Sequence, residues 1–546
     1  MNYTEYKPYV IDVGYLFPSS LADFLGDEDE VHIFREVTEQ LDIGCLDSDF
    51  NVMGQHPYHP RMLLRLLMWG MANRVVSTRR IEVLARRDVS FIYLAGGGKP
   101  DYRTLARLRR RNAGVIKGIF KETVLLCARL GMVNLGNIAP DGTKLKANGS
   151  KHKAMSYGRM KQEEERLEKE IDELMQQAEV VDAEEDKAFG AAHNGYNLPE
   201  ELQRREDRLE KIRSLREQLE REKSEEQHLK EGQTPIIEDK EQRSFAERDA
   251  RMMLMKRGEF DYAYNAQPCM NECGVIVAGD LTNDASDTRH LPDMVEDVRE
   301  LRDELSISET DKKTVMTADR GYFSVENIKQ EGQGIELLIA AGREGKEESA
   351  EAKDRVYWLE RFEYIKESDY WRYPSGRLLV REKKQVLHGR PLLWRYECLD
   401  CEVCSLRRHC LKPGEQRRTL LVKRKQLIRA EMMARLKQPE KQVIYRKRKW
   451  VAEQVFGQIK GGLGFRDLTM RGEDLACAQW LFACTVHNMM KAVRHISSLK
   501  RKETALLISN VARKPAFSGP RPDFFSFPNI TAYGNQHLEN SRDPSS

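Results

Sequence analysis

GVIVAGDLTNDASDTRHLPDMVEDVRELRDEL, residues 274–305, reads as one strand, one polar loop and one helix. The apolar run 274–282 has the length of a buried strand, and polar residues interrupt it before the helix begins. Further strands are predicted at 313–324, where the strand runs into a turn, and at 335–342. Strands that alternate with helices predict a sheet covered by helices, and therefore an α/β domain.

The charge of the chain is informative in its distribution rather than in its sum. The 546 residues carry a formal net charge of only +3, although 32% of them are charged. Residues 61–112, however, hold thirteen Lys and Arg against three acids, which is typical of a surface that contacts nucleic acid. No apolar run reaches the roughly 18 residues of a membrane span, and residues 1–17 lack the pattern of a signal peptide. We therefore expect a cytoplasmic protein that does not involve a membrane.

The basic N-terminal region reads as helical. Residues 61–75 have an apolar face at helical spacing, and residues 77–96 begin with a Ser/Thr cap signal and continue as a helix. Asp101 is expected to cap the next helix. Short helices with arginines on their polar faces suit a DNA-binding domain of the helix-turn-helix kind, although an ordinary helical domain with a solvated basic face has the same pattern. The arginines predicted to contact DNA are Arg79, Arg80, Arg86, Arg87, Arg103, Arg107 and Arg110.

Composition divides the rest of the chain. Apolar residues at four-three spacing within charged sequence predict a coiled-coil hairpin, clustered aromatic residues and cysteines predict a β-rich segment, and a Pro, Gly, Ser and Asn-containing end predicts a flexible tail. The expected segments are 1–130 (helical DNA-binding domain), 131–157 (first part of the core), 158–240 (coiled-coil insertion), 241–345 (core continued), 346–425 (β-rich insertion with four cysteines), 426–497 (helical end of the core) and 498–546 (tail).

Two aspartates stand at predicted strand ends. Asp141 follows a short apolar run in VNLGNIAPDGTKLKAN (133–148), and Asp319 ends the strand VMTAD. The carboxyl ends of strands in an α/β sheet are where ligands gather, although Asp beside Gly is also ordinary turn chemistry. The two aspartates are therefore weak evidence for a ligand site by themselves, and a further acidic residue is needed to support it.

The candidate for this further acidic residue is the single acid of a basic helix. KQVIYRKRKWVAEQVFGQIKGGLGFR, residues 441–466, holds seven Lys and Arg and one acid, Glu453. With the two strand-end aspartates, Glu453 could hold a pair of Mg²⁺ ions, which prefer carboxylate oxygen and promote phosphoryl displacement. The side chains predicted to hold neighbouring phosphates are Tyr445, Arg448, Lys449 and Lys460; three of these, with Arg448 excepted, share one helical face with Glu453.

The chain resembles the DDE transposases of bacterial insertion sequences. The resemblance implies a ribonuclease-H-like catalytic core in which Asp141, Asp319 and Glu453 are the catalytic and metal-binding acids. It rests on four stretches in family order: HPYHPRMLLRLLMWGMANRVVSTRRIEVLARRDVSFIYLAGGGKPDYRTLARLRRR, IAPDGTKLKAN, YNAQPCMNECGVIVAGDLTNDASDTRHL with TADRGYFS, and YRKRKWVAEQVFGQIKGGLGF.

One departure from the family pattern concerns the basic helix. The family signature has Tyr, Arg, Glu and Lys at fixed spacings, and here four residues rather than three separate Arg448 from Glu453. Either Lys449 takes the role of the arginine, or the helix face differs slightly.

The resemblance implies an enzyme that acts on double-stranded DNA. It would bind the terminal inverted repeats of its element as a homodimer, in the bacterial nucleoid, cut a strand with water activated by two Mg²⁺ or Mn²⁺ ions, and join the freed 3′-hydroxyl to target DNA. The alternatives are a non-catalytic DNA-binding or regulatory protein derived from a transposase, and a repair-type nuclease, which the large basic N-terminal region makes less suitable. No P-loop is present, so no nucleotide cofactor is expected.

Four cysteines cluster in CLDCEVCSLRRHC, residues 398–410. Clustered cysteines in a cytoplasmic protein indicate a metal site, here a structural Zn²⁺. His409 is a competing fourth ligand, and an iron–sulfur cluster or four reduced thiols are alternatives. The predicted zinc ligands are Cys398, Cys401, Cys404 and Cys410.

The remaining candidates have weaker support. The loop after the strand 274–282 offers acids that could replace Asp319, but its Asn283 and Asp287 are expected to order the loop or touch DNA. His290 and His487 are expected to be packing or hydrogen-bonding residues. Trp371 and Trp394 are expected to be core aromatic residues, although either could stack on a flipped base.

Overall fold

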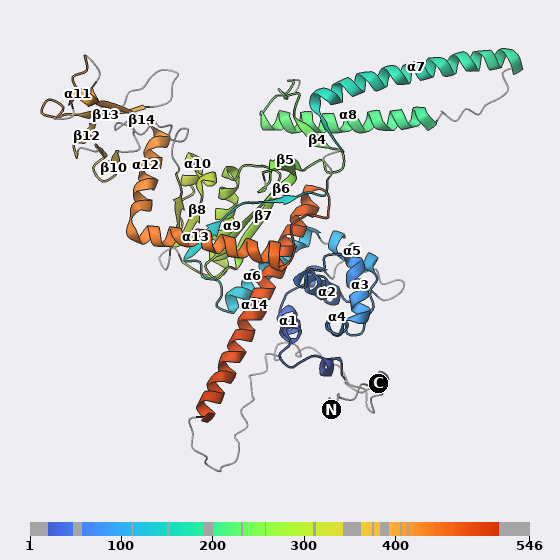
Figure 1. The fold of residues 1–546 in the computed structure, drawn as a ribbon, viewed down its shortest axis with the longest axis horizontal. Helices are drawn as coiled ribbons and strands as arrows, with labels where there is room; N and C mark the ends of the chain where they lie inside the picture. The colour runs from blue at the N-terminus through green and yellow to red at the C-terminus, as the bar shows by residue number, and fades with distance from the viewer. Residues whose placement is uncertain are drawn as a thin grey trace, which may run out of the picture. The chain divides into compact units, whose positions relative to one another are not determined.

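The computed structural model describes most of the chain (Figure 1). The described residues are 20–46, 57–111, 113–149, 153–189, 200–230, 233–256, 258–308, 313–341, 362–373, 376–382, 393–404, 407–411 and 414–512. The chain divides into two compact units, of which the first ends at Arg494 and holds every element discussed below except the C-terminal end of the last helix. Most of the predicted tail, from residue 513 onward, lies outside the described residues.

The N-terminal region is helical, as the sequence predicts. Its helices are α1 (Glu30–Glu39), α2 (Pro60–Ala72), α3 (Thr78–Arg87), α4 (Val89–Leu94), α5 (Tyr102–Arg111) and α6 (Ile116–Arg129), with single 3₁₀ turns at Leu21–Phe24, Gly44–Leu46 and Ala113–Val115.

The single helix expected over residues 77–96 is wrong, because the chain breaks at Asp88. The Asp88 carboxylate accepts the backbone N–H groups of Ser90 and Phe91, so it ends α3 and caps α4. Asp101 caps α5 as predicted, with the N–H of Thr104 donating to its carboxylate at 2.6 Å.

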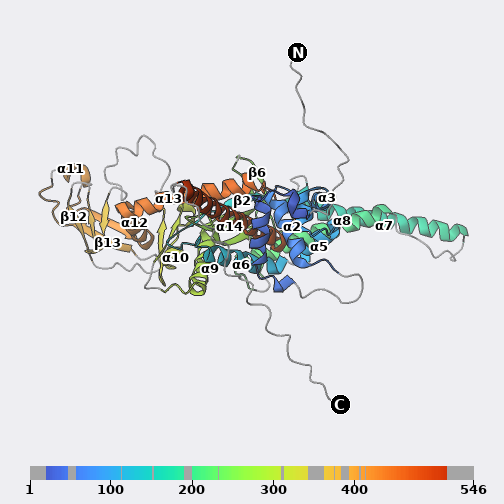
Figure 2. The same ribbon diagram turned by 90° about the horizontal axis from the view of Figure 1, so that it is seen from below.

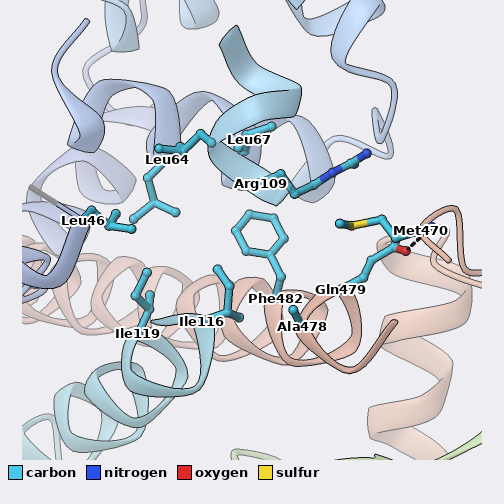
Figure 3. A pocket seen from close by; sticks show the side chains of 11 residues that line it. Leu46, Leu64, Leu67, Arg109, Ile116, Ile119, Met470, Ala478, Gln479 and Phe482 are labelled. Carbon is cyan, nitrogen blue, oxygen red and sulfur yellow. Dashed lines mark hydrogen bonds between the residues drawn. The ribbon is translucent and has the colours of Figure 1, made fainter. Parts of the chain in front are cut away.

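An apolar junction joins these helices to the last helix, α14 (Glu473–Ala512). Phe482 of α14 points between side chains of α2, α5 and α6, beside a cavity of only about 20 Å³ (Figure 3). Leu64, Leu67 and Ile119 form much of its wall, and the aliphatic part of Arg109 covers one side. The N-terminal helices are thus packed against α14 through apolar contacts.

A mixed seven-stranded sheet forms the centre of the molecule, in the order β2-β6-β1-β8-β9, with β5 and β7 also paired to β6. Strands β1, β8 and β9 are parallel to one another, whereas β6 pairs with its neighbours in the antiparallel sense. The strands are β1 (Asn137–Pro140), β2 (Thr143–Lys146), β5 (Arg251–Leu254), β6 (Phe260–Asn271), β7 (Ile276–Thr282), β8 (Thr314–Ala318) and β9 (Ile335–Ile339).

Helices cover this sheet and confirm the predicted α/β class. They are α9 (Leu291–Glu304), α10 (Val325–Ile328), α12 (Arg424–Lys437), α13 (Pro439–Gly457), which continues as a π-helical turn over Gln458–Gly462, and α14. Figure 2 shows α13 and α9 on opposite sides of the strands. Buried residues of α13, among them Val451 and Val455, form its sheet-facing side.

Polar side chains of α14 attach it to the hairpin between β6 and β7. Asn488 accepts the N–H of Ile276 and donates to the carbonyl of the same residue. The buried His487 shares a 2.8 Å hydrogen bond between Nε2 and the carbonyl of Gly274. Satisfied polar contacts of this kind fix the register of a buried helix on a sheet.

Two long helices, α7 (Tyr157–Phe189) and α8 (Glu200–Glu226), pack side by side (Figures 1 and 2). Their ion pairs, Glu164 with Arg216 and Glu170 with Arg205, show that they run antiparallel. A short two-stranded sheet of β3 (Ala154–Ser156) and β4 (Gln242–Ser244) closes the base of the pair.

A five-stranded antiparallel sheet lies between β9 and α12 in the sequence. Its strands are β10 (Glu363–Ile365), β11 (Tyr370–Arg372), β12 (Leu378–Arg381), β13 (Leu393–Cys398) and β14 (Thr419–Lys423), with the short helix α11 (Arg407–Cys410) before the last strand. Trp371 is buried in its core, as expected, and Trp394 packs against that core with the guanidinium of Arg381 over its ring.

None of the helices in the described part of the chain has the length and apolar character that would be required to cross a bilayer.

Because His487 is buried, its contribution to the stability of the fold should depend on pH. Burial lowers the pKa of His487 from 6.5 to about 4, so the folded protein holds this ring neutral while the unfolded chain protonates it first. Its contribution to the free energy of unfolding should be complete above pH 6.5 and should be lost as the pH falls toward 4, by about 3 kcal/mol. Urea unfolding at a series of pH values measures it. His487→Gln keeps an N–H donor but does not titrate, so its unfolding should be less pH-dependent over this range; an unchanged pH dependence would contradict the assignment.

Candidate active site

The register of two parallel strands brings Asp141 and Asp319 together. Ile138 of β1 lies opposite Met316 of β8, so three residues further along both strands Asp141 falls opposite Asp319. Each aspartate is the first residue beyond its strand. Side chains that leave neighbouring parallel strands at the same edge share one site.

Asp141 is held in a half-buried environment with other charges. Burial raises the pKa of Asp141 to about 6; the guanidinium of Arg448 opposes this rise, and the charges of Asp319 and Asp287 add to it. Arg448 Nη1 lies 3.8 Å from Asp141 Oδ2. Asp141 therefore lies within electrostatic range of Asp319, Asp287 and Arg448.

The basic helix α13 places Arg448, and not Lys449, at the aspartates. Lys449 lies on the outer side of the helix with 77% of its side chain exposed. Tyr445, one turn before Arg448, donates from its hydroxyl to the carbonyl of Ala318, the residue that precedes Asp319. Of the two alternatives that the sequence left open, the structure favours Arg448 as the basic neighbour of the acids.

Lys460 binds to the strand that follows Asp141. Its Nζ donates to the hydroxyl of Thr143 at 2.6 Å and to the carbonyl of Lys144, and burial lowers the pKa of its ammonium. Tyr445 of α13 is thus hydrogen-bonded to the end of β8, and Lys460 of the π-helical turn to the start of β2. The Lys460 ammonium faces the protein in this arrangement.

Glu453 lies on the outer side of α13. Its side chain is 69% exposed, and its carboxylate is 3.7 Å from Lys449 Nζ. Among the described residues, no group of three or more His, Cys, Asp or Glu side chains is arranged closely enough to hold a metal ion. The structure therefore brings together two of the three expected acids with Arg448, and leaves Glu453 in solvent on the helix that contacts them.

The sequence predicted only that Asp287 orders its loop or touches DNA, whereas the structure places it beside Asp141. The Asp287 carboxylate accepts the side-chain amides of Asn265 at 2.7 Å and Gln267 at 2.6 Å and lies against Gly142, the residue after Asp141. A Cβ on Gly142 would come within 2.5 Å of Asp287 Oδ1. The sequence signal that pointed to it was an Asp in the polar loop after a strand of the same sheet.

The arginines predicted to bind DNA are all exposed on α3 and α5. The guanidinium groups of Arg79 and Arg103 lie over the ring of Tyr102 from the two helices, and Arg86 forms an ion pair with Glu82. Packing of α3 against α5 therefore gathers Arg79, Arg86 and Arg103 around Tyr102 on one basic surface.

The cysteines sit at the end of β13 and just beyond it. Cys398 and Cys401 are buried, and the N–H of Arg418 donates to Cys401 Sγ at 3.3 Å. Burial, followed by the neighbouring Cys401, raises the pKa of Cys398 to about 11. Cys404 and Cys410 are partly exposed, and the side chain of His409 lies outside the described residues.

Two family models match the chain. One, described as Transposase DDE domain, matches residues 375–493, which include α12, α13 and Glu453. The other, described as Transposase domain (DUF772), matches residues 22–111, the helical N-terminal region.

The resemblance to the DDE transposases is confirmed. Comparison with curated proteins and with solved structures gives no match. The two matched ranges flank the part of the sheet that carries Asp141 and Asp319, so neither match includes these two aspartates.

The closeness of Gly142 to Asp287 can be tested by stability. Gly142→Ala should lower the free energy of unfolding by about 1–3 kcal/mol, because the new methyl group collides with the Asp287 carboxylate. Gly118→Ala is the matched control: no atom lies within 4 Å of the added Cβ in α6, and alanine favours the helix, so this variant should be neutral or more stable. Equal stability of the two variants in urea unfolding would contradict the described packing.

Proposed function

We propose that the chain is a metal-dependent DNA transposase with a ribonuclease-H-like core, acting on the terminal inverted repeats of a bacterial insertion sequence. The observation that carries the proposal is the placement of Asp141 and Asp319 at the ends of adjacent parallel strands under α13, in a chain that matches a DDE transposase family model. The proposed reactions are DNA strand cleavage and transfer of the freed 3′-hydroxyl to target DNA.

The donor set fits Mg²⁺ or Mn²⁺. Asp141 and Asp319 offer only carboxylate oxygen, which these hard cations prefer. A third carboxylate, that of Asp287, lies beside them, and the cationic groups of Arg448 and Lys144 lie 3.8 Å from Asp141 and Asp287 respectively. When bound, a pair of such ions would activate the attacking oxygen and stabilise the leaving one.

The protein groups would divide the remaining work. We assign Asp141, Asp319 and Glu453 to holding the ions. Glu453 is exposed on the outer side of α13, so its part in the assignment requires α13 to turn this carboxylate toward the two aspartates. Arg448 lies where it can contact a phosphate next to the scissile one, and the exposed Lys449 extends the basic surface along the helix. Tyr445 and Lys460 hold α13 against the two strand ends.

DNA recognition is assigned to the exposed arginines of α3 and α5. These helices present Arg79, Arg86 and Arg103 on one surface, and charge of this kind binds the phosphate backbone. Because two element ends must be processed, we propose that a homodimer acts on them, on DNA of the bacterial nucleoid in the cytoplasm.

We propose in addition that Cys398, Cys401, Cys404 and Cys410 hold a structural Zn²⁺. Two of the four thiols, those of Cys398 and Cys401, are buried next to each other, and the backbone N–H of Arg418 donates to Cys401 Sγ. The ion would attach α11 and the β13–β14 connection to the five-stranded sheet.

The catalytic assignment is tested by strand cleavage. Purified protein with Mg²⁺ or Mn²⁺ should nick duplex DNA that carries the gene's native flanking sequence, as read on a denaturing gel. Ala substitution of Asp141, Asp319 or Glu453 should lower the rate by more than about 100-fold, because each removes a proposed metal ligand, while gel-shift binding of the same DNA persists. Glu326→Ala, an exposed acid shortly after Asp319, is the control and should cleave normally. Undiminished cleavage by Glu453→Ala would remove that residue from the assignment, and DNA binding without cleavage by the native chain would favour the regulatory alternative.

The zinc assignment is tested by metal content. Protein purified in zinc-containing medium should hold one equivalent of Zn²⁺ per chain by elemental analysis, and Cys401→Ser should lose it. Cys127→Ser, a buried cysteine of α6 outside the cluster, is the control and should keep its zinc. Iron in place of zinc, or equal zinc in both variants, would contradict the assignment.

A further inference from the structure

We propose that Asp287 is the positioning residue that sets the spacing between Asp141 and Asp319. This inference rests on the proposed function, because it concerns the aspartates assigned to metal binding. It identifies a role for a residue of the β7–α9 loop, which is remote in sequence from both aspartates.

The carboxylate of Asp287 is fixed from the sheet side. Oδ1 accepts two amides, from Asn265 at 2.7 Å and Gln267 at 2.6 Å, and both donors come from the central strand β6. Lys144 Nζ lies 3.8 Å from the same oxygen. Asn265 and Gln267 are fully buried, so the position of Oδ1 is determined by the core of the sheet.

The same carboxylate touches the turn after each aspartate. An added Cβ on Gly142 would lie 2.5 Å from Asp287 Oδ1, and an added Cβ on Gly321 would lie 3.1 Å from Asp287 Oδ2 and 3.0 Å from Asp319 Oδ1. Oδ1 of Asp287 thus lies close to Gly142, the residue after Asp141. Oδ2 of Asp287 lies close to Gly321, two residues after Asp319. A Cβ at Gly142 would displace the Asp287 carboxylate, and a Cβ at Gly321 would require a small shift of it.

Further hydrogen bonds attach the Asp287 loop to the Asp319 turn. Thr288 donates from its hydroxyl to the carbonyl of Gly321 at 2.6 Å, and Asn327 donates to the carbonyls of Thr288 and Tyr322. The hydroxyl of Tyr322 donates to Gln267, whose amide donates to Asp287. The turn after Asp319, the loop and strand β6 therefore form one connected polar network.

This network explains what Asp287 does for the two aspartates. Strand pairing places Asp141 and Asp319 opposite each other, each one residue beyond its strand, and the N–H of Asp141 still donates to the carbonyl of Pro268 in β6 at 3.1 Å. Asp287 fills the space between the two following turns and fixes both to β6. Residues that orient metal ligands in this way commonly affect metal affinity by about 10–100-fold when removed.

The experiment compares Asp287→Ala with Asp287→Asn in the full chain. Mn²⁺ affinity is measured by electron paramagnetic resonance titration, cleavage kinetics on the same DNA, and fold integrity by circular dichroism. Asp287→Ala should bind Mn²⁺ about 10–100-fold more weakly with a native spectrum. Asp287→Asn keeps an oxygen that accepts the Asn265 and Gln267 amides, so it should return Mn²⁺ affinity and kcat close to the native values.

Two controls separate the possible explanations. Asp284→Ala removes an acid of the same loop, one that accepts the N–H of Ser286 and does not contact Gly142 or Gly321, and should leave Mn²⁺ affinity unchanged. Gln267→Leu should weaken Mn²⁺ binding as Asp287→Ala does, and the double variant should be no weaker than either single one, because both act through the same hydrogen bond.

Each outcome is decisive. Native Mn²⁺ affinity in Asp287→Ala would overturn the positioning role, and so would an Asp287→Asn variant as weak as Asp287→Ala, since that result would make the residue a metal ligand itself. A native chain that binds no Mn²⁺ and cuts no DNA would overturn the proposed function, and this inference with it.

Discussion

The parallel pairing of β1 with β8 is the constraint on which the site depends. It sets residues that are far apart in the sequence, Asp141 and Asp319, at the same edge of the sheet. Every residue of both strands is buried, and the observed register pairs Asn137 with Val315 and Ile138 with Met316. Helix α13 then crosses the two strand ends and is attached to them by Tyr445 and Lys460. The sheet thus determines where the acids lie, and the helix determines which basic side chain faces them.

Bringing carboxylates together at a partly buried edge opposes folding, because burial disfavours their charged form and like charges repel. The raised pKa of Asp141, due first to burial, is the direct sign of this cost. The protein offsets it in part with Arg448 and with the amides that hold Asp287. In the proposed metal-dependent reaction, a bound cation would offset the rest.

Much of this could be predicted from the sequence. The positions of Asp141 and Asp319 at strand ends could be predicted because in each case a short apolar run stops at Asp. The helical N-terminal region could be predicted because its apolar residues recur at regular helical spacing. The break at Asp88 was missed because its capping bonds interrupt a pattern that otherwise continues as a helix. The choice between Arg448 and Lys449 could not be made, because it depends on how α13 is rotated against the sheet. The same rotation leaves Glu453 exposed. The position of Asp287 depends on hydrogen bonds to β6 from a loop that follows a different strand, and no local spacing encodes it.

The most direct measurement is an anomalous difference map from crystals of the chain soaked with Mn²⁺. The account predicts a peak within about 2.5 Å of a carboxylate oxygen of both Asp141 and Asp319, at the strand ends of β1 and β8. Manganese bound elsewhere with these two carboxylates empty, under conditions in which the protein cuts DNA, would contradict the account.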